Sequence, residues 1–295
     1  MALADPAFAQ GPARTAFRPA TEEPAWLRRT LVAAVLVILA LLVLAPLAAV
    51  LVEALSEGVG ALGEALSEED ARSAVRLTLI VAAVAVPLNA LFGVAAAWAL
   101  TKFRWRGKAL VLSLIDLPFS VSPVVAGLCF VLLFGANSAM GSWLVAQGHP
   151  IVFAVPGIVL ATMFITFPFV ARELVPLMTE QGTAEEEAAL TLGASGWRMF
   201  HTVTLPNIRW ALLYGVLLCN ARAMGEFGAV AVVSGKIRGQ TATMPIMIEM
   251  LYNEYLSVAA FGMAALLTLL ALVTLLIKSA LEWRHADQLR ASGRH

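Results

Sequence analysis

Charged residues are scarce in this chain of 295 residues: they make up 14% of it, whereas 60% of the residues are hydrophobic. The mean hydropathy is +0.83. A soluble domain carries about 25% charged residues, so the composition excludes an ordinary soluble protein and indicates a membrane protein. The bilayer, rather than a globular core, is therefore expected to set the architecture.

Cysteine and histidine are also rare, with two and four residues. Cys129 and Cys219 lie in apolar stretches and have neither metal-site nor disulfide spacing, so we expect two small buried side chains. No histidine lies beside another candidate ligand or nucleophile. We expect no metal site in this chain.

Motifs that carry enzyme chemistry are missing as well. The sequence has no GxxxxGK[ST] and no HExxH, and GASG at Gly193–Gly196 is not a GxSxG nucleophile elbow. No basic stripe with interleaved aromatic residues indicates nucleic acid as a partner. The chain is expected to be non-catalytic, with no cofactor of its own.

Long apolar runs dominate what remains. Six of them can cross a bilayer core of about 30 Å, which predicts an all-α polytopic membrane protein. The first run is too long for a signal peptide and has no persuasive cleavage site, so we interpret it as an uncleaved span. The expected spans are Thr30–Val52, Ala74–Leu100, Ala109–Gly135, Ile151–Met178, Asn207–Gly235 and Leu256–Leu281.

The distribution of lysine and arginine predicts the orientation of these spans. With the N-terminus inside, the inner segments hold fifteen of the twenty basic residues and the outer segments hold four, while Arg222 is intramembrane. Both termini are therefore expected in the cytoplasm. The chain divides into a flexible cytoplasmic tail (1–29), a six-span transmembrane domain (30–282) and a C-terminal cytoplasmic tail (283–295).

The loop between the fourth and fifth spans, residues 183–206, is the most polar internal stretch. Thr183 and Glu186 have capping-box spacing, which predicts the start of a short helix. Gly193 is expected to end that helix in the left-handed conformation. Ser195 is expected to cap a second short helix, and Pro206 suits the first turn of the helix that follows. The loop is therefore predicted to fold into a helix–glycine–helix knuckle on the cytoplasmic side.

The knuckle resembles a known signature. Its residues Glu187, Ala188 and Ala189, then Gly193, then Val203-x-Leu205-Pro206, are similar to the motif EAA-x3-G-x9-I-x-LP of ABC importer permeases, with Val203 for isoleucine as the departure. The resemblance implies the MetI-like fold of type I importers. It also implies that Glu187, Ala188, Ala189, Gly193, Leu205 and Pro206 couple the chain to a separate ATP-binding subunit. An interfacial turn without a partner is the alternative.

The fifth span carries an unusual charge. Arg222 lies some 20 Å from the cytoplasmic start of the span, at 1.5 Å per residue. An arginine at that depth costs about 2.5–3.5 kcal/mol, so it must face protein or water. Glu226, one turn later, can neutralise it, while Gly225 and Gly228 allow close helix approach or a local break.

Two interpretations of Arg222 remain open. It forms a structural pair with Glu226, or it lines a translocation path and offers its guanidinium group to an anion. In the second interpretation the path is lined by Asn220, Arg222, Gly225, Glu226 and Gly228. Lys236 and Arg238 lie in the outer loop that follows, and three interpretations of them remain open. They meet a docking protein, they guide an anion inward, or they are solvated loop charges.

The C-terminal third extends the resemblance. ARAMGEFGA is similar to the fifth-span motif of oxyanion permeases, and residues 185–283 as a whole are similar to the CysW type of sulfate/thiosulfate permease subunit. This resemblance implies import across the bacterial inner membrane by alternating access. The implied partners are a CysT-type second permease subunit, two copies of a CysA-type ATPase that binds ATP and Mg²⁺, and a periplasmic sulfate- or thiosulfate-binding protein.

Three other functions remain as alternatives. A molybdate or tungstate permease would have similar fifth-span chemistry, because these solutes are also tetrahedral oxyanions. An ion-coupled secondary transporter or channel would use Arg222, Glu226 and Asp116 as a charge relay and would give the knuckle no role. A membrane scaffold would carry no solute at all.

Overall fold

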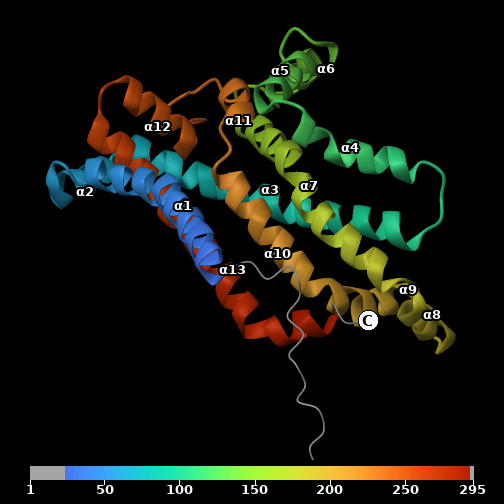
Figure 1. Ribbon diagram of the computed structural model, residues 1–295. Coiled ribbons are helices and arrows are strands. Elements are labelled where there is room, and N and C mark those ends of the chain that lie inside the picture. The colour runs from blue at the N-terminus through green and yellow to red at the C-terminus, as the bar shows by residue number, and fades with distance from the viewer. Residues whose placement is uncertain (1–23, 293–295) are drawn as a thin grey trace, which may run out of the picture. The chain divides into compact units, whose positions relative to one another are not determined.

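The computed structural model describes residues 24–292, and the regular elements in that range are all helices (Figure 1). This confirms the predicted all-α class. The chain divides into two units, residues 1–49 and 50–295. The first unit holds most of α1 (Ala25–Ala54), so this helix begins within the segment predicted to be a flexible tail. The remainder of that predicted tail, residues 1–23, lies outside the described residues.

The predicted spans correspond to helices of membrane-crossing length. Within the described range, five helices and one bent helix pair are long and apolar enough to cross a bilayer. The first, second, fourth and sixth spans are α1, α3 (Glu69–Lys102), α7 (Val155–Gln181) and α13 (Ser257–Ser292). The last helix thus continues into the segment that was assigned to the C-terminal tail.

The third span is not the continuous helix that the sequence predicted. It consists of α4 (Lys108–Ser120) and α5 (Pro123–Phe134), and the chain bends by 108° between them. Val121 and Ser122 have ψ values of 133° and 134°, which end the helix. Pro123 explains the break at Ser122, because a proline ring disfavours helical geometry at the preceding residue.

The fifth span is also broken, so the prediction of one helix over Asn207–Gly235 is wrong. α10 (Leu205–Met224) ends one residue before Gly225, and a short helix, α11 (Gly228–Val233), begins after Phe227. A local break, which is one of the two possibilities raised for Gly225 and Gly228, is therefore present. The remaining elements are short: α2 (Gly58–Ser67), α6 (Ala139–Ala146), α8 (Ala184–Thr191), α9 (Gly196–Met199), the π-helical turn η2 (Phe200–Thr204) and α12 (Met244–Asn253).

The two broken spans pack against each other through glycines. A Cβ atom at Gly228 of α11 would lie 2.8 Å from Pro123 Cβ, and one at Gly127 of α5 would lie 2.7 Å from the carbonyl oxygen of Ala229. Any side chain at either position would force α5 and α11 apart, since real Cβ atoms do not come this close to their neighbours. The breaks and the glycines together bring α11 against α5 (Figure 1).

The helices α3, α7 and α10 form the core of the second unit. A Cβ atom at Gly93 of α3 would lie 2.6 Å from Val170 Cγ1, and one at Gly215 of α10 would lie 3.1 Å from Val170 Cα. Such small residues allow close helix packing where lipid removes the hydrophobic drive for helices to associate. Buried Asn89 joins the same helices, because its Nδ2 donates to Thr166 Oγ1 (2.7 Å) and lies 3.7 Å from Cys219 Sγ.

The two cysteines differ in burial. Cys219 is buried, as expected, whereas Cys129 is exposed on α5, so the expectation for Cys129 is wrong. The physical reason is that apolar sequence in a membrane span does not distinguish a side chain packed against protein from one on the helix surface, because lipid is apolar too.

Candidate functional site

The predicted knuckle between the fourth and fifth spans is present. α8 begins at Ala184, and Gly193 follows it with φ of 89°, in the left-handed region where only glycine is unstrained. Ser195 accepts a hydrogen bond from the Arg198 amide at 3.3 Å and so caps α9. The positions of both helix starts and of the glycine stop are therefore confirmed.

The capping box is not formed. Thr183 precedes α8, but its side chain accepts no cap hydrogen bond; its hydroxyl donates to Glu187 Oε1 at 2.7 Å instead. Glu186, the predicted reciprocal partner, points into the protein and contacts Lys102 and Thr204. The prediction of a capping box at Thr183 and Glu186 is therefore wrong, because tertiary contacts of Glu186 replace the local one.

The second helix of the knuckle is not a separate element. α9 continues through η2 into α10, so that Gly196–Met224 is one helical run. The widened turn lies directly before Leu205 and Pro206. Pro206 has no N–H to donate to the preceding turn, which favours such a departure from regular α-helix. The predicted place of Pro206 in the first turn of α10 is confirmed.

Three large apolar side chains of the knuckle are exposed. The side chains of Leu192 and Trp197 are 89% and 73% exposed, and Leu190 is exposed as well. Ala188 is also exposed, and Glu187 lies on the exposed part of α8. Large apolar side chains clustered on a polar loop mark a surface that another protein covers. The ridge, defined here as Leu190, Leu192 and Trp197, is thus a candidate docking surface.

The fifth span places its charged pair at the helix break. Arg222 Nη1 lies 2.6 Å from Glu226 Oε2. The Glu226 side chain is buried, whereas that of Arg222 is 35% exposed. Glu226 Oε1 also accepts a hydrogen bond from the Ala229 amide at 3.0 Å, at the start of α11. The ion pair with Glu226 is therefore formed, and the Arg222 side chain stays partly exposed.

The other residues predicted to line a path have different surroundings. Asn220 Nδ2 lies 3.4 Å from Thr274 Oγ1 of α13, so Asn220 contacts a neighbouring helix. Gly228 is packed against Pro123, whereas a Cβ atom at Gly225 would have ordinary contacts only. Asp116 forms an ion pair with Arg172 at 3.3 Å, on α4 and α7, and not with Arg222. The charge relay of Asp116, Arg222 and Glu226 is thus not assembled in this structure.

Both basic residues of the loop between α11 and α12 have acidic partners within the second unit. Lys236 Nζ lies 2.5 Å from Glu249 Oε2. Arg238 bonds both carboxylate oxygens of Glu254 and lies 3.9 Å from Asp70 Oδ2. Docking of another protein at Lys236 and Arg238 stays a prediction, and such a protein would meet these residues as neutralised pairs.

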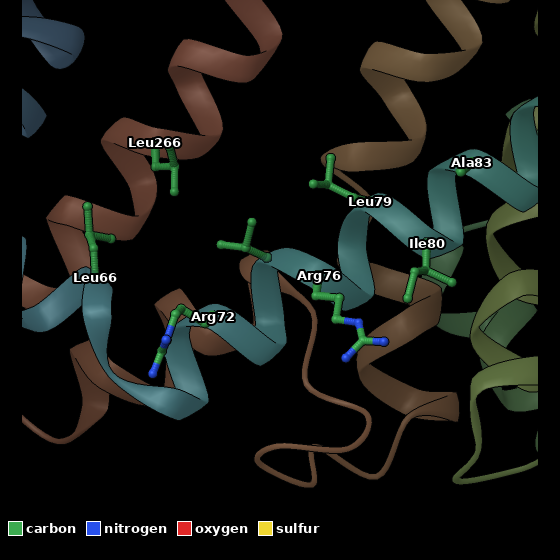
Figure 2. A pocket seen from close by; sticks show the side chains of 8 residues that line it. Leu66, Arg72, Arg76, Leu79, Ile80, Ala83 and Leu266 are labelled. Atoms are coloured by element: carbon green, nitrogen blue, oxygen red, sulfur yellow. The ribbon is translucent and has the colours of Figure 1, made fainter.

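A groove of about 730 Å³ lies between α2, α3 and α13. Figure 2 shows the side chains of Leu66 and Leu266 near this groove, while the guanidinium groups of Arg72 and Arg76 point away from one another. An oxyanion site requires donors that converge on one point. The lining of this groove is therefore not that of an anion site.

Sequence reasoning missed the polar contacts between α8 and the end of α3. In the sequence, Lys102 contributes only to the excess of basic residues on the predicted inner segments, and Glu186 only to the predicted capping box. The structure joins them at 2.7 Å, with both side chains nearly enclosed. No sequence spacing links residues 102 and 186, so a pairing of this kind has no local signal.

Comparison with known proteins decides the family. Residues 89–285 match the family model described as "Binding-protein-dependent transport system inner membrane component". The chain belongs to this family. It is accordingly a multi-pass, non-catalytic permease subunit of an ABC importer.

Two relatives and one solved structure extend the likeness. The permease is 51% identical over 263 residues to the sulfate transport system permease protein CysW of Escherichia coli (strain K12), covering 89% of this chain and 90% of that protein. It is 35% identical over 249 residues to the sulfate transport system permease protein CysT of the same strain, covering 84% and 90%. It therefore resembles CysW more than CysT.

The fold is shared with a bacterial alginate ABC transporter solved in complex with a periplasmic protein bound to an alginate pentasaccharide. The TM-score is 0.71 at 16% sequence identity, over 88% of this chain and 94% of the matched chain. At this identity the likeness concerns the fold alone.

Proposed function

We propose that this permease imports sulfate and thiosulfate across the cytoplasmic membrane by alternating access, driven through its knuckle by a separate ATPase. The exposed apolar ridge of Leu190, Leu192 and Trp197 is the observation that carries the coupling part of the proposal. Large apolar side chains exposed on a polar loop are typical of a surface that a partner covers. The relationship to CysW supports sulfate as the substrate.

The proposed assembly contains a CysT-type second permease subunit, two CysA-type ATPase subunits that bind ATP and Mg²⁺, and a periplasmic binding protein. Nucleotide binding closes the ATPase subunits and carries the knuckle with them, which opens the paired spans outward. Hydrolysis resets the spans inward. The two states must differ in their affinity for the ATPase and for the solute, because only differential binding shifts such an equilibrium.

The orientation of the chain in the membrane follows from the same proposal. With the knuckle on the ATPase side, both termini lie in the cytoplasm, in agreement with the excess of basic residues on the inner segments. The exposed side of Arg222 then faces the path and contacts the anion, while buried Glu226 weakens the attraction enough for release.

Reconstitution in liposomes tests the proposal. The complete complex is expected to hydrolyse ATP faster when sulfate-loaded binding protein is added, and to accumulate labelled sulfate. Excess thiosulfate is expected to compete with sulfate and molybdate is not; the reverse result would identify a molybdate or tungstate permease.

One variant tests the coupling step separately. Glu187→Lys places a positive charge on the exposed part of α8 and is expected to abolish ATP-driven uptake. Unchanged uptake by this variant, or uptake driven by an ion gradient without the ATPase, would refute the proposed coupling.

A further inference from the structure

Glu186 is the only side chain of α8 that is buried. Its neighbours Glu185 and Glu187 are exposed, as charged residues in a loop usually are. A buried carboxylate is costly unless it is paired and hydrogen-bonded. The contacts of Glu186 therefore show what α8 is attached to.

Each oxygen of the Glu186 carboxylate has its own partner. Oε2 lies 2.7 Å from Lys102 Nζ, and Oε1 accepts a hydrogen bond from Thr204 Oγ1 at 3.0 Å. The paired side chains of Lys102 and Glu186 are only 8% and 11% exposed. The Lys102 ammonium group also donates to the carbonyl oxygen of Gly182, just after the end of α7.

Lys102 is the last residue of α3, a helix of 34 residues. The chain itself connects the knuckle to α7 at one end and to α10 at the other. No such covalent connection joins the knuckle to α3, which lies far away in sequence. The ion pair supplies that connection for α8, and the rings of Trp98 on α3 and Phe200 on η2 lie with their centroids 5.0 Å apart. α3 in turn packs on α7 and α10 through Gly93 and Asn89.

We propose that Lys102 is a positioning residue that transmits movement of α8 to α3 through its buried ion pair with Glu186. This inference rests on the proposed coupling function and names a residue outside the signature-bearing loop that serves it. An enclosed pair suits the task, because charges shielded from water attract one another more strongly than exposed charges do. Without Lys102, α8 would lose its direct ionic contact with α3 and would act on α3 only through α7, α10 and η2.

The test uses the complete reconstituted complex. Lys102→Met removes the charge, and Lys102→Arg keeps it. Arg106→Met is the matched control, because Arg106 is an exposed cation in the loop that follows α3. The measurements are the amount of assembled complex, the basal ATPase rate, the ATPase rate with sulfate-loaded binding protein, and sulfate uptake.

Lys102→Met is expected to keep the ATPase subunits bound while the stimulation of hydrolysis by loaded binding protein falls by about fivefold or more, the lower end of typical coupling factors. Lys102→Arg is expected to retain most of the stimulation, and Arg106→Met to retain all of it. Stimulation and uptake by Lys102→Met at the level of the unmodified complex would overturn the inference.

Lys102→Met leaves the Glu186 carboxylate buried without its partner, so this variant can accumulate poorly in the membrane. A second variant keeps the inference testable in that case. Lys102→Met combined with Glu186→Gln removes both charges, which relieves that penalty. Restored assembly without restored stimulation supports the inference. Restored stimulation in the double variant overturns the inference, because transmission then does not need the pair. Failure of the double variant to assemble also overturns it, because the pair then serves assembly alone.

Glu187→Lys separates this inference from the proposed function. If Glu187→Lys abolishes uptake and Lys102→Met does not, the knuckle couples the complex and only the role of Lys102 is lost. If neither variant affects uptake, the proposed function itself is wrong.

Discussion

The Arg222 guanidinium group lies 2.6 Å from the Glu226 carboxylate and bridges the break between α10 and α11. Arg222 is in the last turn of α10, where a positive charge complements the helix dipole, and Glu226 precedes α11, where a negative charge does so. Glu226 also accepts the Ala229 amide hydrogen of α11. One pair of charges therefore stabilises the ends of two helices at the point where the span is interrupted.

Removal of Arg222 separates its structural role from a role in transport. Arg222→Gln leaves the buried Glu226 carboxylate unpaired, which costs about 3–5 kcal/mol for a fully buried pair and less here, because the Arg222 side chain is partly exposed. We expect reduced membrane abundance for Arg222→Gln and recovered abundance for Arg222→Gln combined with Glu226→Gln. Uptake per molecule is expected to stay lost in the double variant if Arg222 contacts the anion; recovered uptake would assign the pair to structure alone.

Gly193 is expected to be sensitive to the smallest possible side chain. A Cβ atom there would meet nothing within 4 Å, so the effect of Gly193→Ala comes from the φ of 89° alone. A strained backbone of this kind costs about 1–3 kcal/mol, and we expect weaker binding of the ATPase and slower uptake. Gly196→Ala is the control, since Gly196 is equally open but has no positive φ. Equal effects of the two substitutions would contradict the prediction.

A charge on the apolar ridge is expected to prevent docking. Leu192 is 89% exposed, so Leu192→Asp disturbs little within the permease itself. We expect normal membrane abundance together with loss of the ATPase from affinity-purified complexes, because a charge in an apolar interface must be desolvated. Ile237→Asp is the control, because Ile237 is an exposed residue of the loop between α11 and α12. Retention of the ATPase by Leu192→Asp would show that the ridge is not the docking surface.

The close contact between α3 and α7 predicts that a larger side chain at Gly93 disturbs helix packing. Gly93→Val places a Cβ atom 2.6 Å from Val170 Cγ1. Overpacking of this kind costs about 1–3 kcal/mol or more, so we expect lower abundance and a lower thermal denaturation temperature in detergent. Gly60→Val in α2 meets nothing within 4 Å and is expected to leave both unchanged. A Gly93→Val protein as stable as the Gly60→Val protein would disprove this close packing.

Local sequence signals located the helices well. Runs of apolar residues placed the spans, Gly193 placed the end of α8, and Ser195 placed the start of α9, because each of these features depends on neighbouring residues only. The signature around Glu187 likewise identified the knuckle. The breaks at Ser122 and Phe227 were harder to predict, because prolines and glycines inside a membrane span are compatible with either a kink or an interruption.

Local sequence patterns did not predict most of the partners of the charged side chains. The sequence by itself determined which segments are apolar enough to cross a membrane, the family signature and the pairing of Arg222 with Glu226 four residues later. These features depend on hydropathy and spacing over short stretches of chain. Only the tertiary structure decided that Glu186 turns inward to Lys102, that Asp116 meets Arg172, and that Lys236 and Arg238 are neutralised. These contacts join residues from different helices, and their formation depends on how those helices pack.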